Sequence, residues 1–150
     1  MSGVVSYELL NSKLPTNSGW TADGGIFETF INDTGATSVK GTIVVTSSSV
    51  NYAVSIAPAD SQMPMGIIAE SGIANGANVK VTVYGKAYVL LKNGESATRG
   101  YWCEVSDTAG RMAQQATVPS TIEHNREIGH SLETVSSGTN VLSLIQVHFN

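Results

Sequence analysis

Turn-forming residues interrupt the chain about every ten residues from Phe27 onward, and this spacing limits the fold more than any other feature of the sequence. Between the turns lie short runs rich in Val, Ile, Thr and Tyr, which are favoured in β-strands. No stretch after Gly25 keeps apolar residues at the i, i+3, i+4 and i+7 positions of an amphipathic helix over three turns. We therefore predict an all-β chain with a single antiparallel β-sandwich or β-barrel domain over residues 26–150.

The clearest predicted strand is residues 79–84, where valines alternate with Lys80, Thr82 and Tyr84. Alternation places the two sets of side chains on opposite faces of the strand. Gly85 then predicts a bulge or bend. Asn93-Gly94 is the strongest turn signal and predicts a type I′ turn, in which both central residues have positive φ. The other expected strands are residues 41–45, 50–56, 65–69, 87–91, 101–105, 111–113, 127–135 and 140–149, with a longer polar connection over residues 119–125.

Residues 1–25 differ from the rest of the chain. Their apolar residues follow neither the helical nor the strand period, and Pro15 and residues 16–19 interrupt any element. One interpretation is an extended N-terminal arm or a short helix that lies on another surface, and the other is a first strand and loop of the main domain. Apolar and aromatic side chains dominate the energetics of interfaces, so the arm supplies candidate contact residues, unless they cover the bottom of their own barrel. These residues are Val4, Val5, Tyr7, Leu9, Leu10, Leu14 and Trp20.

Charged residues are scarce, at 13% of the chain against about 25% in ordinary globular domains. Disordered chains are usually rich in charge, so disorder does not explain the deficit. Eight basic and twelve acidic residues give a net charge of −4 with no Lys/Arg run, so we expect no nucleic-acid partner. No apolar stretch reaches the length of a transmembrane helix, and the N-terminus lacks the pattern of a secretory signal. We expect no membrane partner, and a surface that is either covered largely by Ser, Thr, Asn and Gly or hidden against other subunits.

Asp33-Thr34-Gly35-Ala36 matches the local signature of aspartic proteases, in which two aspartates share one proton. A chain with one copy of the motif would have to form a homodimer to use Asp33 in this way. Asn32 stands where those enzymes usually have an apolar residue, and residues 32–38 fit a polar turn between two strands equally well. The protease is therefore the least favoured of our functional hypotheses.

Other candidate chemical groups give little support for an enzyme. His124, His130 and His148 are not spaced to bring two imidazoles together on one helix face, so we predict no metal site. Cys103 follows Trp102 in an expected strand, with no neighbouring general base, and is expected to be a small buried residue. As the lone cysteine it also fits a reducing compartment. We predict no catalytic residues and no cofactor.

Several short motifs follow one another between Phe30 and Asn150. In chain order they are N-D-T-G-A-T-S-V-K-G at 32–41, G-I-I-A-E at 66–70, I-A-N-G-A at 73–77 leading into V-K-V-T-V-Y-G-K-A at 79–87, S-D-T-A-G-R-M at 106–112, R-E-I-G-H-S-L-E at 126–133 and V-L-S-L-I at 141–145. This ordered series resembles bacteriophage virion proteins of the capsid decoration (cement) or head-fibre type. The chain departs from that pattern at Tyr101-Trp102-Cys103, and its N-terminal arm has no match.

The resemblance implies a structural protein that assembles in the host bacterial cytoplasm and binds the outer surface of a phage head as a homotrimer. Its partners would be the major capsid protein and two copies of itself, and the arm residues would contact the capsid or a neighbouring subunit. Three weak arms on one trimer would raise the avidity through effective concentration. The alternative is a tail-fibre or receptor-binding, lectin-like module in which Trp20, Tyr101 or Trp102 stacks on a sugar.

Overall fold

The computed structural model describes residues 17–150, and this part of the chain is almost entirely β-structure. The all-β prediction is confirmed. The elements are β1 (Ser18–Trp20), β2 (Gly25–Asn32), β3 (Ile43–Thr46), β4 (Ala53–Ile56), β5 (Gly66–Ile68), β6 (Asn78–Leu90), β7 (Trp102–Val105), β8 (Met112–Gln115), α2 (Thr121–Arg126), β9 (Glu127–Ser131) and β10 (Leu142–Val147). No helix among residues 17–150 has the length and apolar character needed to cross a membrane.

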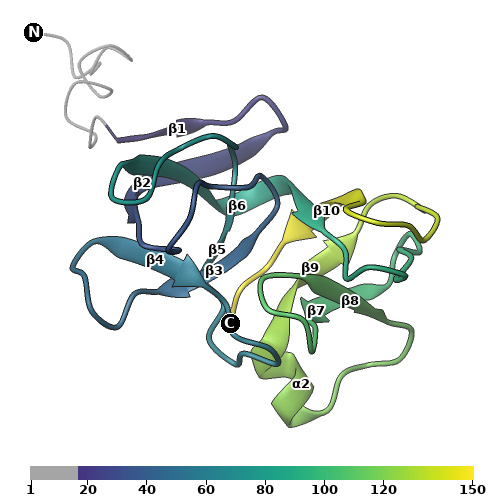
Figure 1. Cartoon of the computed structure of the whole chain (residues 1–150). Coiled ribbons are helices and arrows are strands. Elements are labelled where there is room, and N and C mark those ends of the chain that lie inside the picture. Colours follow the sequence, from purple (N-terminus) through teal and green to yellow (C-terminus); the bar gives the residue numbers. More distant parts are fainter. Residues whose placement is uncertain (1–16) are drawn as a thin grey trace, which may run out of the picture.

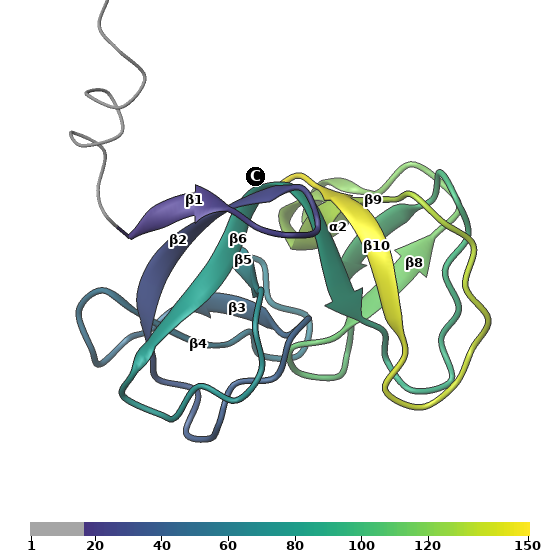
Figure 2. The same cartoon turned by 90° about the horizontal axis from the view of Figure 1, so that it is seen from above.

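The strands form one continuous sheet in the order β1-β2-β4-β3-β5-β6-β10-β9-β7-β8, and an additional pairing joins β2 to β6. This pairing closes β2, β4, β3, β5 and β6 into a small barrel, with β1 on its outside (Figure 1). The β2–β4 pair is parallel, whereas all other pairs of named strands are antiparallel. Figure 2 shows that β10, β9, β7 and β8 form a second half beside the barrel. The domain is therefore a barrel on one side and, on the other, a sheet that we call the open sheet, in which a single bridge between Leu91 and Met112 links β8 to the residue after β6.

Strand β6 belongs to both halves of the molecule. Its first part pairs with β2 and β5, and its second part pairs with β10. Val79 and Val81 are fully buried while Lys80 is exposed, as the alternation predicts, but Thr82 is buried as well, so the alternation does not extend to residue 84. The register shift lies opposite Ile26 and Phe27, just before Gly85, whose φ is +83°. A Cβ at this glycine would lie 2.9 Å from the Gly24 carbonyl oxygen, so the bend requires glycine.

Two apolar clusters stabilise the halves, and each fully buried Val, Leu or Ile side chain contributes about 1.5–3 kcal/mol. One cluster fills the barrel and consists of Val44, Val54, Ile68, Val79 and Val81. The other is larger, underlies the open sheet, and includes Val89, Leu91, Cys103, Met112, Ile128 and Ile145. Cys103 is fully buried, as predicted.

Two local predictions are wrong. The Asn93-Gly94 turn exists, because the Glu95 amide donates to the Lys92 carbonyl, but only Gly94 has positive φ, so the turn is not type I′. The connection over residues 119–125 contains the short helix α2. Ser120 accepts from the Glu123 amide and Glu123 accepts from the Ser120 amide, a reciprocal capping box that explains why a helix starts here.

Candidate functional site

The predicted contact residue Trp20 lies at the end of β1, on the outside of the barrel. Trp20 pairs with Ile26 of β2, and Ile26 pairs on its other side with Tyr84 of β6. Trp20 is 70% exposed and Tyr84 is 65% exposed, so two large aromatic side chains lie uncovered on the two strands that flank β2. We call Trp20, Ile26 and Tyr84 the aromatic row. The other predicted contact residues, Val4, Val5, Tyr7, Leu9, Leu10 and Leu14, lie outside the described residues.

Residues 17–25 follow the second interpretation of the N-terminal region where the structure describes them. Ser18–Trp20 forms a strand that pairs with β2, and Gly25 is the first residue of β2. Thr21 stabilises the turn between the two strands, because its hydroxyl accepts from the Gly25 amide at 3.0 Å. Trp20 is therefore held on the domain by a β-hairpin.

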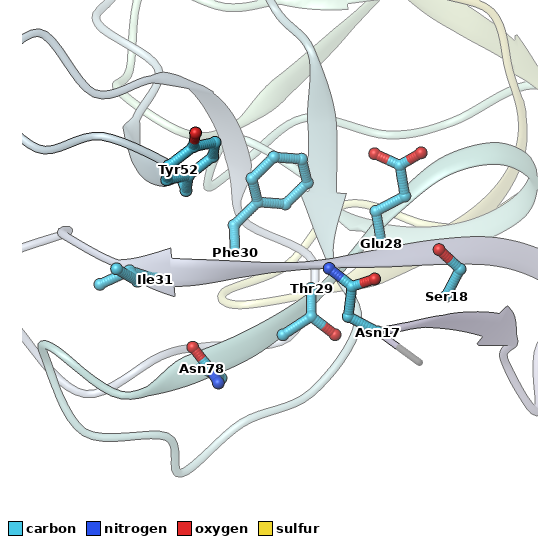
Figure 3. A pocket seen from close by; sticks show the side chains of 8 residues that line it. All are labelled: Asn17, Ser18, Glu28, Thr29, Phe30, Ile31, Tyr52 and Asn78. Atoms are coloured by element: carbon cyan, nitrogen blue, oxygen red, sulfur yellow. The ribbon is translucent and has the colours of Figure 1, made fainter. Parts of the chain in front are cut away.

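A groove of about 440 Å³ opens at the other end of β1 (Figure 3). Its position follows from the pairing of β2, which contacts β1 as far as Glu28 and β4 only from Ile31 onward. The side chains of Tyr52, Phe30 and Glu28 extend to one side of β2 in Figure 3. The groove is lined by Asn17, Ser18, Glu28, Thr29, Phe30, Ile31, Tyr52 and Asn78.

Tyr52 is held at the edge of this groove by a tightly bonded turn. The Ser47 amide donates to the Ala53 carbonyl, and the Ser47 hydroxyl accepts from the Val50 amide at 3.1 Å. The Tyr52 carbonyl accepts from the Ile31 amide of β2 at 2.8 Å. Tyr52 has a φ of +57°, in the left-handed region that costs a non-glycine residue of order 1–2 kcal/mol. The ring is nevertheless 85% exposed, so the fold presents an aromatic side chain to solvent at a strained position.

The polar side chains of the groove are chemically available. No hydrogen bond within residues 17–150 involves the side chains of Asn17, Ser18, Glu28, Thr29 or Asn78, nor the Tyr52 hydroxyl. Together they offer a carboxylate, two amides and three hydroxyl groups. The groove thus combines two aromatic rings with both donors and acceptors.

The Asp33-Thr34-Gly35 motif forms a structural turn. Asn32 is fully buried, and its amide nitrogen donates to the carbonyls of Ala36 and Ile73 at 3.0 and 2.9 Å. Its side-chain oxygen accepts from the Thr34 amide at 3.1 Å. The Asp33 carboxylate accepts from the Ser47 hydroxyl at 2.6 Å and thereby fixes the turn that carries Tyr52. This geometry gives the motif a structural role in the turn.

The three histidines surround Glu127 and Trp102. The buried Glu127 carboxylate lies 2.9 Å from Nδ1 of His124 and 2.9 Å from Nδ1 of His148. Trp102 contacts His130 and His124, with ring centroids 4.4 and 5.5 Å apart. No group of three or more His, Cys, Asp or Glu side chains in the described part of the chain is arranged to hold a metal ion. The cluster ties α2 and the C-terminal residues to the open sheet.

Cys103, Tyr101 and Trp102, which the sequence analysis also considered, are poorly placed for reaction or binding at the protein surface. Burial, together with the charge of Glu127, raises the pKa of Cys103 to about 12, so its thiolate is not accessible at neutral pH. Tyr101 and Trp102 are half-buried, and the imidazoles of His124 and His130 already cover Trp102. Tyr52, Phe30 and Glu28 were not predicted, because the sequence carries no signal that these residues from separate parts of the chain line one groove.

Comparisons with known proteins support the fold. No family model matches the chain, and no curated protein matches it in sequence. Among solved structures, the chain is similar to the N base of the head fibre gp8.5 of bacteriophage phi29, with a TM-score of 0.56 and 13% sequence identity. The match covers 81% of this chain and 92% of the head-fibre base. The chain therefore has the fold of a phage head-fibre base.

Proposed function

We propose that the protein is a structural component of a bacteriophage virion, a head-fibre-type decoration protein that binds the outside of the head. The observation that carries this proposal is the shared fold, which extends over nearly the whole head-fibre base. The ordered motifs over residues 30–150 point to the same class of protein. We further propose that it acts as a homotrimer whose partner is the major capsid protein and whose binding stabilises the head.

The aromatic row is a candidate attachment surface together with residues 1–16. Exposed Trp and Tyr side chains contribute much of the energy when they become buried in interfaces. Trp20 is held by the β1–β2 hairpin and follows the apolar residues of the N-terminal segment within a few positions. A trimer carries three such surfaces, so modest affinity at each is multiplied by effective concentration.

A second exposed apolar group is a candidate surface between subunits. Ile122 of α2 and Val118 before it are exposed, as is Met63. The hydrogen bond between Asn125 and Gln62 brings the Met63 loop to α2, so these side chains belong to one region of the open half. Monomeric proteins seldom leave such regions uncovered. We expect Ile122→Glu to convert the trimer to monomers.

The proposal is tested by mass measurement and by binding to phage heads. We expect the full chain to have the mass of a trimer in solution and to co-sediment with heads that lack it. Trp20→Ala should weaken co-sedimentation, and deletion of residues 1–16, which leaves β1 intact, should abolish it. Tyr52→Ala removes another highly exposed aromatic side chain, which lies outside the aromatic row, and serves as the matched control.

A monomeric wild-type protein would contradict the homotrimer. Full co-sedimentation of both the Trp20→Ala and the truncated proteins would contradict the attachment surface. If the wild-type protein does not bind the heads of the phage that encodes it, the proposed function as a decoration protein is wrong.

A further inference from the structure

The groove at the start of β1 has the size of a small-molecule site. Its volume of about 440 Å³ lies within the range of roughly 300–1,000 Å³ found for ligand pockets. Its walls come from four separate parts of the chain, namely residues 17–18, 28–31, 52 and 78. Each part is fixed by strand pairing or by the turn around Ser47, so the groove is formed before any ligand binds.

The polar lining restricts the chemistry of the ligand. Elsewhere in the domain, polar side chains such as Asn32, Ser38 and Asn75 are engaged in hydrogen bonds with the backbone. Those of the groove have no such bonds within residues 17–150. A purely apolar ligand would leave them unpaired and desolvated, which is unfavourable.

The charge of the groove residues further restricts which chemical classes of ligand would bind. Glu28 is the one charged residue among the groove residues, so phosphates, nucleotides and other anions are disfavoured. A ligand that suits a carboxylate, two amides and several hydroxyls must both donate and accept hydrogen bonds at many closely spaced positions. Sugar hydroxyl groups have this property.

The aromatic side chains of the groove would contact the apolar face of such a ligand. A pyranose ring presents a patch of C–H groups that packs against an aromatic ring, while its hydroxyls project around the edge. Tyr52 is 85% exposed, and the Ser47 turn restricts its backbone, so little conformational entropy is lost when it binds. Phe30 lies beside it on the same side of β2 (Figure 3).

We propose that the groove between β1 and β4 binds a short neutral saccharide, with Tyr52 as the stacking platform and Glu28, Asn17 and Asn78 as hydrogen-bonding partners. The site lies at the opposite end of β1 from Trp20, and the inference does not depend on attachment to a phage head. A virion protein with this site would carry a saccharide-binding surface in addition to its structural role.

The test is a titration of the ¹⁵N-labelled full chain with named saccharides, followed by amide chemical shifts. The probes are N,N′-diacetylchitobiose, cellobiose, maltose and lactose, with sialyllactose and inorganic phosphate as anionic comparisons. We expect at least one neutral probe to give saturable shifts at residues 17–18, 28–31, 52 and 78. Anionic probes should give none there.

Three variants distinguish a loss of stacking on Tyr52 from a loss of the folded structure. Tyr52→Ala should weaken binding by about tenfold or more, whereas Tyr52→Phe, which keeps the ring, should retain it. Tyr84→Ala removes a comparably exposed tyrosine from the aromatic row and should bind like the wild type. Unchanged shifts at residues far from the groove confirm that each variant is folded.

The proposal is overturned if no neutral probe shifts the groove residues. It is equally overturned if phosphate binds there instead, or if Tyr52→Ala binds as tightly as the wild type. Because head binding is measured with Trp20 variants, failure of saccharide binding leaves the proposed attachment intact, and the reverse also holds.

Discussion

Replacement of Asn32 by Ala tests whether the Asp-Thr-Gly segment is a structural turn. The Asn32 side chain is fully buried and makes three hydrogen bonds, to the Thr34 amide and to the carbonyls of Ala36 and Ile73. Each such bond contributes a net 0.5–1.5 kcal/mol, so the variant should lose about 3 kcal/mol. For a domain of this size the loss corresponds to a fall in Tm of roughly 6–12 °C.

The assay is urea unfolding followed by far-UV circular dichroism, with Tm measured in parallel by calorimetry. Asn75→Ala is the matched control, because the Asn75 side chain is exposed and accepts one hydrogen bond, from the Gly35 amide at 2.8 Å. We expect this control to lose about 1 kcal/mol or less. Equal losses in the two variants would refute the reasoning, since burial and the number of bonds would then make no difference.

Three further predictions concern single groups in the open half. Gly129→Ala should destabilise the fold by about 3 kcal/mol or more, measured by urea unfolding, because φ is +146° and a Cβ would lie 1.9 Å from the Gln146 carbonyl oxygen. Cys103, with a pKa of about 12 and no exposure, should react with a thiol reagent only at the rate of global unfolding; rapid labelling of the native protein would contradict its burial. Hydrogen bonds from Gln115 and from the Ser120 cap lower the pKa of Glu123 from 4.5 to about 2, so its stabilising effect is present above pH 4.5 and is lost as the pH falls towards 2. The difference in Tm between wild type and Glu123→Gln should therefore shrink over that interval, and a constant difference would contradict this assignment.

Periodic patterns in the sequence predict much of the sheet. The alternation holds at residues 79–81, where Val79 and Val81 are buried and Lys80 is solvated, which is the condition for a period of two. It fails at Thr82, which is buried although the pattern places it on the solvated face, next to the position where the register of the β2–β6 pair shifts. Helix α2 was not predicted because it buries no side chain and so has no apolar stripe. The sequence feature that indicates α2 is the capping box formed by Ser120 and Glu123. It was not recognised because Pro119 and the polar residues around it favour a loop.

The candidate sites were less predictable from the sequence. Trp20 was identified because it is a large aromatic residue in a segment without a core pattern, and it is indeed exposed. The groove could not be found in this way, because it joins residues 17–18 to Tyr52 and Asn78 through the pairing of β2. The positive φ of Tyr52 was equally hidden, since left-handed residues are usually expected at glycine.

Because strand β6 is shared by both halves of the domain, it affects how the domain unfolds. The same strand places Val79 and Val81 in the barrel core and Ala87 and Val89 in the second core, so we expect the two halves to unfold together. Amide protons along β6 should therefore exchange with solvent only when the whole domain unfolds. Under load, a domain of this kind should therefore yield as a whole rather than half by half.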